Sequence, residues 1–141
     1  MTRTDRTEAL TRLYAWLDAE VARRGWTCRA CGECCHFARH GHELFCSALE
    51  AAYLFGDDAS GEMTDPSVCP FLENERCTRR DRRTLSCRIY HCSASGGDEM
   101  SALSEEALSR LKRLHERLGL PWRYASLWRH HERRKVLLSQ E

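Results

Sequence analysis

Four cysteines lie within eight residues in the segment 28–35, which reads CRACGECC. Four more follow between Cys69 and Cys92. Thiolates are the soft ligands that zinc ions and iron–sulfur clusters select in proteins. The sequence therefore predicts a metal centre whose sulfur ligands come from two separate blocks of the chain.

The first block combines two spacings that metal sites use. Cys28 and Cys31 with Gly32 have the form of a metal knuckle, in which the glycine permits a tight turn beside the sulfur atoms. Cys34 repeats the spacing, so that three thiols form a CxxCxxC tripod of the kind that holds three corners of a cubane cluster. Because adjacent side chains diverge, Cys34 and Cys35 either serve two different metals or only one of them is a ligand.

The cysteine pattern leaves the identity of the metal open. Eight thiolates satisfy two tetrahedral zinc ions, or one cubane with thiols to spare, or a pair of iron sites. The tripod and the Cys69–Pro70 pair slightly favour iron or an iron–sulfur cluster, whereas the knuckle favours zinc as the alternative. Cys46, the remaining cysteine, resembles a buried small apolar residue more than a ligand. Four histidines near the blocks stay open as further ligands: His36, His40, His42 and His91.

The amino-acid composition indicates the cellular compartment and the kinds of binding partner to expect. The nine cysteines are an odd number, and the N-terminal segment lacks the apolar run and cleavage site of a secretory signal. We therefore expect a cytoplasmic protein with thiols rather than disulfides. The chain has 22 basic and 21 acidic residues, and no run approaches a membrane span. The expected partners are metal ions, with a protein partner left open, and neither membrane nor nucleic acid is expected.

Helical patterns indicate the elements that position the cysteines. After a cap at Asp5, apolar residues recur at helical spacing over residues 10–21. Ser47 and Glu50 form a capping box for a short helix over residues 48–55. Both segments flank the first cysteine block, so we expect them to pack against the cysteine-rich centre.

The C-terminal part of the chain also has a helical pattern. After a hinge at residues 95–97, we expect Ser104 to cap a helix that ends at Gly119 and Pro121 to begin a last helix. The basic run 129–135 could contact RNA or an acidic partner, although a solvated helix face is the commoner explanation. The arginines around Cys87, including Arg88, either offset the charge of thiolates or are ordinary solvated side chains.

Together these elements predict a small, mainly α, metal-stabilised fold with an irregular, loop-rich centre. We expect an N-terminal helix in residues 1–27, a cysteine-cluster metal-binding domain in 28–95, and a C-terminal helical hairpin in 96–141, packed as one unit. Because the centre lacks a long apolar pattern of its own, its folding should depend on the metal.

The order CxxCGxCC, then CPFL, then C-x9-C-R-x-Y-x-C resembles that of the bacterial zinc- or iron-chelating cysteine-cluster family, the YkgJ-like proteins. In this chain Thr84 replaces the proline of the family's Arg-Pro step, and His91 replaces the usual proline before the last cysteine. The flagellin lysine N-methylases carry a related cysteine cluster in a longer chain. The resemblance covers residues 28–92 and implies metal binding by eight cysteines: Cys28, Cys31, Cys34, Cys35, Cys69, Cys77, Cys87 and Cys92.

Several classes of function follow from this pattern. In the first, complete cysteine ligation makes a non-catalytic metal-binding protein for electron transfer or metal handling. In the second, one metal keeps an open position, and the protein is an oxidoreductase or a modification enzyme related to the flagellin lysine N-methylases, with no catalytic residue assigned. The absence of Walker, GxGxxG and HExxH motifs favours the first class. An RNA-binding zinc protein is a third alternative.

Overall fold

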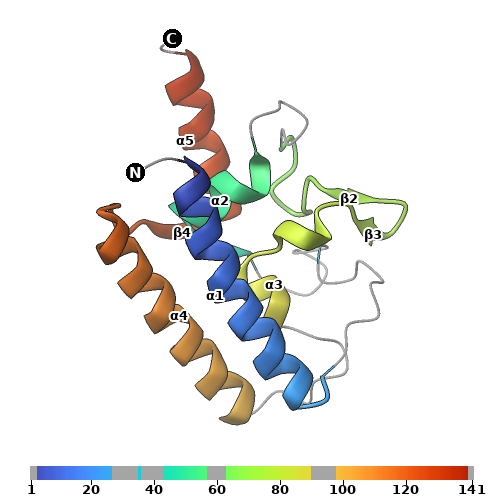
Figure 1. Ribbon diagram of the computed structural model, residues 1–141. Coiled ribbons are helices and arrows are strands. Elements are labelled where there is room, and N and C mark those ends of the chain that lie inside the picture. Colours follow the sequence, from blue (N-terminus) through green and yellow to red (C-terminus); the bar gives the residue numbers. More distant parts are fainter. Residues whose placement is uncertain (1–2, 27–34, 36–42, 57–62, 90–97, 140–141) are drawn as a thin grey trace. The chain divides into compact units, whose positions relative to one another are not determined.

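The computed structural model of the chain describes residues 3–26, 35, 43–56, 63–89 and 98–139, apart from the side chains of Arg3 and of residues 135–139 (Figure 1). The described residues are mainly helical, with a helix near the N-terminus and two near the C-terminus, which confirms the predicted fold class. None of the described helices is both long enough and apolar enough to cross a lipid bilayer. The helices are α1 (Arg3–Arg23), α2 (Ala48–Phe55), α3 (Leu85–Ile89), α4 (Asp98–Leu118) and α5 (Leu127–Ser139). The strands form two antiparallel pairs, β1 (Phe45–Ser47) with β4 (Tyr124–Ser126) and β2 (Leu72–Glu73) with β3 (Arg76–Cys77).

The chain divides into two units, each built from two stretches of sequence. The first unit comprises Met1–Arg29 and Arg83–Trp122, and it holds α1, α3 and α4. The second comprises Ala30–Arg82 and Arg123–Glu141, and it holds α2, α5 and the four strands. The domain boundaries and the C-terminal hairpin expected from the sequence remain predictions.

Leucine-rich helix faces build the first unit. Helices α1 and α4 lie side by side, and α3 packs against both (Figure 1). The residues of α1 that recur at helical spacing are buried, as the sequence predicted: Leu10, Leu13, Tyr14, Leu17 and Val21. Each buried leucine contributes about 2 kcal/mol of hydrophobic stabilisation. The buried row that α4 contributes is Leu103, Ala107, Leu111 and Leu114.

Arg88 fastens the short helix α3 to α1. Its side chain is 6% exposed, and its Nη1 donates to Oδ2 of Asp18 at 2.8 Å. The guanidinium carbon lies 4.0 Å from the centre of the Tyr14 ring, and Nε donates to the carbonyl oxygen of Arg83 at 2.8 Å. A buried cation loses its hydration, so these contacts are what make the position tolerable. Arg88 thus has a carboxylate and an aromatic ring as partners.

Two helix starts differ from the sequence prediction. Helix α4 begins at Asp98, and Asp98 and Glu99 occupy its first turn, where the helix dipole favours carboxylates. Ser104 lies inside the helix and does not cap it, because the helix has already begun one and a half turns upstream. Helix α1 likewise begins before Asp5, which lies in its first turn.

The last helix also begins later than predicted. Residues 124–126 are extended and form β4, so Pro121 does not start a helix. The strand exists because its backbone pairs with β1, with Cys46 opposite Ala125 at the centre of the register. The backbone hydrogen bond from Leu127 to the carbonyl of Leu44, at 2.8 Å, continues this pairing into the first turn of α5. A partner distant in sequence therefore overrides the local helical pattern.

Each strand of this pair leads directly into a helix that a serine caps. Ser47 Oγ accepts from the backbone N–H of Glu50 at 3.2 Å, and Glu50 Oε1 accepts from the N–H of Ser47 at 3.1 Å. Ser126 Oγ accepts from the N–H of Arg129 at 3.3 Å at the start of α5. The capping box predicted from the sequence is confirmed, and so is the helix over residues 48–55 that it begins.

Candidate metal centre

Cys35 and Cys69 bring one residue of each cysteine block together in the second unit. The backbone N–H of Cys69 donates to the carbonyl oxygen of Cys35 at 2.8 Å. Cys35 is 6% exposed and Cys69 is 7% exposed. The five described cysteines carry thiols rather than disulfides. Two shielded thiols on adjacent backbones suit a soft metal ion, which binds thiolate in surroundings that exclude water.

A β-hairpin follows Cys69 and contains Cys77 in its second strand. Cys77 of β3 pairs with Leu72 of β2, and Asn74 and Glu75 form the turn with φ values of 50° and 62°. This left-handed pair is typical of the two-residue turns that match the twist of a hairpin. The N–H of Leu72 donates to the carbonyl oxygen of Cys69 at 3.2 Å, so the chain turns directly after Cys69. Cys77 therefore lies at the open end of the hairpin, and Cys69 lies three residues before its first strand.

Phe71 anchors this hairpin in the apolar interior of the second unit. It is 4% exposed, and its ring centre lies 5.7 Å from that of Phe55 in α2. Its carbonyl oxygen accepts from the N–H of Thr78 at 2.7 Å and from the hydroxyl of Thr78 at 2.6 Å. Because Phe71 follows Cys69 by two residues, this packing also fixes the backbone at Cys69.

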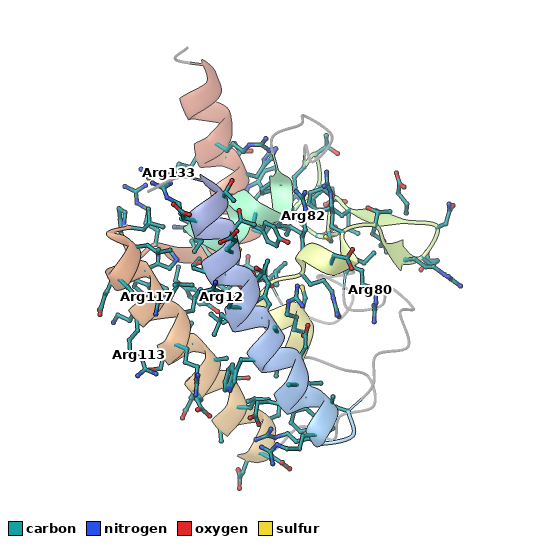
Figure 2. The ribbon with its side chains drawn as sticks, viewed as in Figure 1. Arg12, Arg80, Arg82, Arg113, Arg117 and Arg133 are labelled. Carbon is teal, nitrogen blue, oxygen red and sulfur yellow. The ribbon has the colours of Figure 1, made fainter. Side chains whose placement is uncertain are left out.

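Arginines that follow the hairpin lie against aromatic rings of the second unit. The Arg79 guanidinium is 5.1 Å from the centre of the Phe71 ring. The Arg82 guanidinium is 5.2 Å from that of Tyr53, and Arg82 Nη1 donates to the Tyr53 carbonyl at 3.3 Å (Figure 2). A Cβ atom added at Gly56, where φ is +69°, would lie only 2.8 Å from Arg82 Nη1. The positive φ at the end of α2 is what favours glycine here, because the flexible end of Arg82 could shift to admit a Cβ atom.

Cys87 belongs to the first unit, on α3. Its backbone N–H donates to Thr84 Oγ1 at 3.4 Å, which makes Thr84 the cap of a helix that begins at Leu85. Thr84 is fully buried and Cys87 is half-buried. The Cys87 carbonyl also accepts a long hydrogen bond, 3.5 Å, from Arg83 Nη1. Thr84 therefore supplies a side-chain cap that a proline at this position would lack.

The other predicted ligands lie outside the described residues. This applies to four cysteines of the two blocks and to the four histidines that the sequence left open: Cys28, Cys31, Cys34, Cys92, His36, His40, His42 and His91. Within the ranges that are described, no group of three or more His, Cys, Asp or Glu side chains is arranged to hold a metal ion. The ligand set thus stays a prediction. Among its described members, Cys35 and Cys69 are joined by a backbone hydrogen bond.

Cys46 is fully buried in β1, which agrees with its expected character as a small apolar residue. In the same strand Ser47 is also buried whereas Phe45 is exposed, and the carbonyl oxygen of Cys46 is 2.8 Å from His130 Nε2. A carbonyl oxygen only accepts, so Nε2 carries the proton and donates. The backbone at Cys46 is thereby fixed to α5.

Sequence reasoning missed two buried histidines of α5. His130 is 9% exposed and His131 is 5% exposed. His131 Nε2 accepts from the N–H of Met63 at 3.0 Å, and its ring stacks on Trp128 with centres 5.6 Å apart. The sequence places both histidines in a basic run that predicts a solvated face. Their one detectable signal is helical spacing from the apolar residue Leu127, which puts positions 130 and 131 on the same face.

Comparisons with protein-family models, with curated proteins and with solved structures found no match to this chain. The resemblance to the cysteine-cluster family therefore remains a prediction that depends on the cysteine spacing, the CPFL motif and the arginine after Cys87.

Proposed function

We propose that this protein binds a metal through cysteine thiolates from its two cysteine blocks. The observation that supports this most is the 2.8 Å hydrogen bond between the backbones of Cys69 and Cys35, with both residues buried. A metal with ligands from two distant segments requires these segments to meet, and closing the intervening loop costs conformational entropy that ligation can offset. The pair supplies two ligands, and the remaining cysteines of the blocks would complete the coordination.

A purely structural role for the buried cysteines is the competing explanation. Buried cysteine often serves as a small apolar residue, as it does at Cys46. Packing alone, however, gives no reason for eight further cysteines within residues 28–92, three of which have CxxCxxC spacing. The cationic side chains of Arg79 and Arg82 in the same unit also fit a thiolate site, because four thiolates around a divalent ion leave a net negative charge.

The proposed group is iron or an iron–sulfur cluster, with zinc as the alternative. An iron–sulfur cluster would supply one-electron transfer, whereas zinc in a closed cysteine site would supply structure. We infer a non-catalytic role in electron transfer or metal handling in the cytoplasm, where a reducing environment keeps the thiols available. A protein that exchanges electrons or metal with this one is the expected partner.

Elemental analysis of protein purified under argon, together with a visible absorption spectrum, tests the choice of metal. We expect stoichiometric iron and absorption that bleaches on reduction. Oxygen must be excluded because it can destroy a cluster and allow zinc to replace it. Colourless, iron-free protein with stoichiometric zinc would select the alternative, and protein without any metal would contradict the proposal.

Serine substitutions test the ligand assignment. Cys69→Ser should remove most of the metal, because a serine hydroxyl is a poor ligand for a soft ion. Cys46→Ser is the matched control, since Cys46 is equally buried but is not a proposed ligand. Metal content per folded protein is the measurement. Equal metal loss in both variants would show that the effect comes from disturbed packing rather than from a lost ligand.

A further inference from the structure

A basic pocket lies between α1 and α4 in the first unit, and no cysteine is among the residues that line it. Its cavity has a volume of about 570 Å³ and is lined by Arg12 and Trp16 from α1 and by Arg110, Arg113 and Arg117 from α4. This volume is in the range of about 300–1,000 Å³ that is typical of small-molecule sites. We call these five residues and their cavity the basic pocket.

Helical spacing explains why the pocket has this composition. The lining residues of α1 follow positions 9, 12, 13 and 16, and those of α4 follow 110, 113, 114 and 117. Both sets have the i, i+3, i+4, i+7 spacing of a single helix face. Leu13 and Leu114 belong at the same time to the buried rows through which the two helices pack. The small side chain of Ala9 leaves the space that the arginines surround.

The charges in the pocket are unbalanced. The four arginines face one carboxylate partner, Glu106, whose Oε1 lies 3.2 Å from Arg110 Nη2. No hydrogen bond or ion pair with any described residue is formed by Arg12, Arg113 or Arg117, which Figure 2 shows on α1 and α4. Other arginines of the same unit do have carboxylate partners, as Arg88 has Asp18. Gathered guanidinium groups repel one another, and an anion in the pocket would remove this cost.

Trp16 and Arg110 together form a flat surface in the pocket. The guanidinium carbon of Arg110 lies 3.9 Å from the centre of a Trp16 ring, which is a close cation–π contact. The Nε atom of Arg110 is buried and has no hydrogen-bond acceptor among the described residues. A planar ring can stack on such a surface, while phosphate oxygens are the acceptors that the forked guanidinium donors match best.

We propose that the basic pocket binds a small phosphorylated anion of the nucleoside diphosphate class. The phosphates contact Arg12, Arg113 and Arg117, and the planar base stacks at Trp16 and Arg110. Four guanidinium groups and one carboxylate carry about three net positive charges, which balance the charge of a diphosphate group near neutral pH. This inference does not depend on the proposed metal function, because every residue that carries it lies on α1 or α4.

Isothermal titration calorimetry on the full, metal-loaded protein at low ionic strength tests the proposal with three probes. ADP should bind, pyrophosphate should bind more weakly, and adenosine should not bind. Arg113→Gln with Arg117→Gln should weaken ADP binding by about 100-fold, at about tenfold for each lost charge-assisted contact. Arg133→Gln on α5 is the charge-matched control, because Arg133 is exposed and is not one of the residues that line the pocket. It should change the affinity less than about twofold.

Two further variants resolve the remaining outcomes. Arg12→Gln, on the other helix, should weaken ADP binding by about tenfold and carries the test if circular dichroism shows that the double variant is unfolded. Trp16→Leu should weaken ADP binding and leave pyrophosphate binding unchanged. The proposal is overturned if neither ADP nor pyrophosphate binds at millimolar concentration. It is also overturned if the arginine variants bind ADP normally, as they would for an anion held at the metal, or if Arg133→Gln causes an equal loss.

Discussion

His130 and His131 are neighbours on α5, yet their rings carry the proton on opposite nitrogens. His130 donates through Nε2 to the Cys46 carbonyl, whereas His131 accepts at Nε2 from the Met63 N–H. The proton of neutral His131 therefore lies on Nδ1, which faces Glu132 Oε1 at 3.3 Å. Both Nε2 atoms are engaged with backbone, so these two histidines fasten α5 and do not offer Nε2 to a metal.

A third buried histidine makes stability depend on pH. His115 is 1% exposed, donates through Nδ1 to the Pro121 carbonyl at 3.1 Å and meets the Trp122 ring edge-on. Burial lowers the pKa of His115 below its ordinary value of 6.5, although the Pro121 carbonyl opposes this shift. The unfolded chain therefore binds a proton that the folded chain does not, as the pH falls through the ordinary pKa. The free energy of unfolding should decrease there and level off below the folded pKa.

Urea unfolding across this pH range, compared with His115→Asn, checks the expectation. Asparagine keeps a donor for the Pro121 carbonyl but has no titratable group. As the pH is lowered from neutral, the free energy of unfolding of the wild-type protein should fall more than that of His115→Asn. The other histidines and the thiols are common to both proteins and cancel in the comparison. Parallel pH profiles would mean that His115 does not contribute.

A side-chain contact could be predicted from the sequence only when its two residues are close together along the chain. Ser47 and Glu50 are three residues apart, so their capping box can be read directly from the sequence. His131 bonds to Met63 across 68 positions, and no local pattern encodes that contact. The same limit explains why Arg88 was read as a solvated or thiolate-associated cation, since its partner Asp18 is 70 positions away.

At the scale of elements, β1 with α2 and β4 with α5 repeat one short pattern. Each strand is an aromatic residue, a small residue and a serine, Phe45-Cys46-Ser47 and Tyr124-Ala125-Ser126. In the antiparallel register each aromatic residue lies opposite the serine of the other strand. The two rings stack with centres 6.3 Å apart, and each serine begins a helix. The pair is thus approximately two-fold symmetric about Cys46 and Ala125.

The two serine caps should differ in their contribution to stability. Ser47→Ala should lower the free energy of unfolding by about 1–2 kcal/mol, because it breaks a reciprocal capping box in a buried site. Ser126→Ala removes a single, longer hydrogen bond and should cost about 0.5–1 kcal/mol. Urea unfolding followed by circular dichroism measures both, with the exposed Ser109→Ala as a neutral control. A larger loss at Ser126 than at Ser47 would contradict this ranking.

Element boundaries were predictable only where they are set locally. The short helix α2 follows from its capping box and from Gly56, both within one turn of its ends. Strand β4 was missed because Tyr124 to Ser126 are extended only through pairing with β1. The start of α4 was placed too late because Ser104 offered a plausible local cap inside a helix that Asp98 and Glu99 begin.

At the scale of the whole molecule, metal removal should affect the two units differently. The core of the first unit is a set of leucines on two long helices, whereas the hairpin region of the second depends on short elements around Cys69 and Cys77. We expect a chelator to increase amide hydrogen exchange in residues 69–78 and to leave residues 10–21 and 107–114 protected. Mass spectrometry of peptides before and after metal removal measures this. Restored protection on adding the metal back is the control, and equal exchange in all three segments would contradict the expectation.

The sequence predicted the class of fold, whereas the metal centre and the domain boundaries that it indicated stay predictions. Hydrophobic periodicity reveals that Leu10 and Leu111 lie on buried faces, yet it does not state which faces pack together. The division into units that each combine an early and a late stretch is a property of tertiary pairing. For the same reason the contact of Cys35 with Cys69 was an expectation of the metal hypothesis rather than of any local pattern.

Because the second unit consists of residues 30–82 and 123–141, its two parts are synthesised at different times. During translation β1 and α2 leave the ribosome long before β4 and α5. Until then the edge of β1 has no strand to pair with, and Cys46 lacks the helix that covers its backbone. The segment that holds β1 and α2 therefore cannot complete its strand pairing until residues 123–141 have been synthesised.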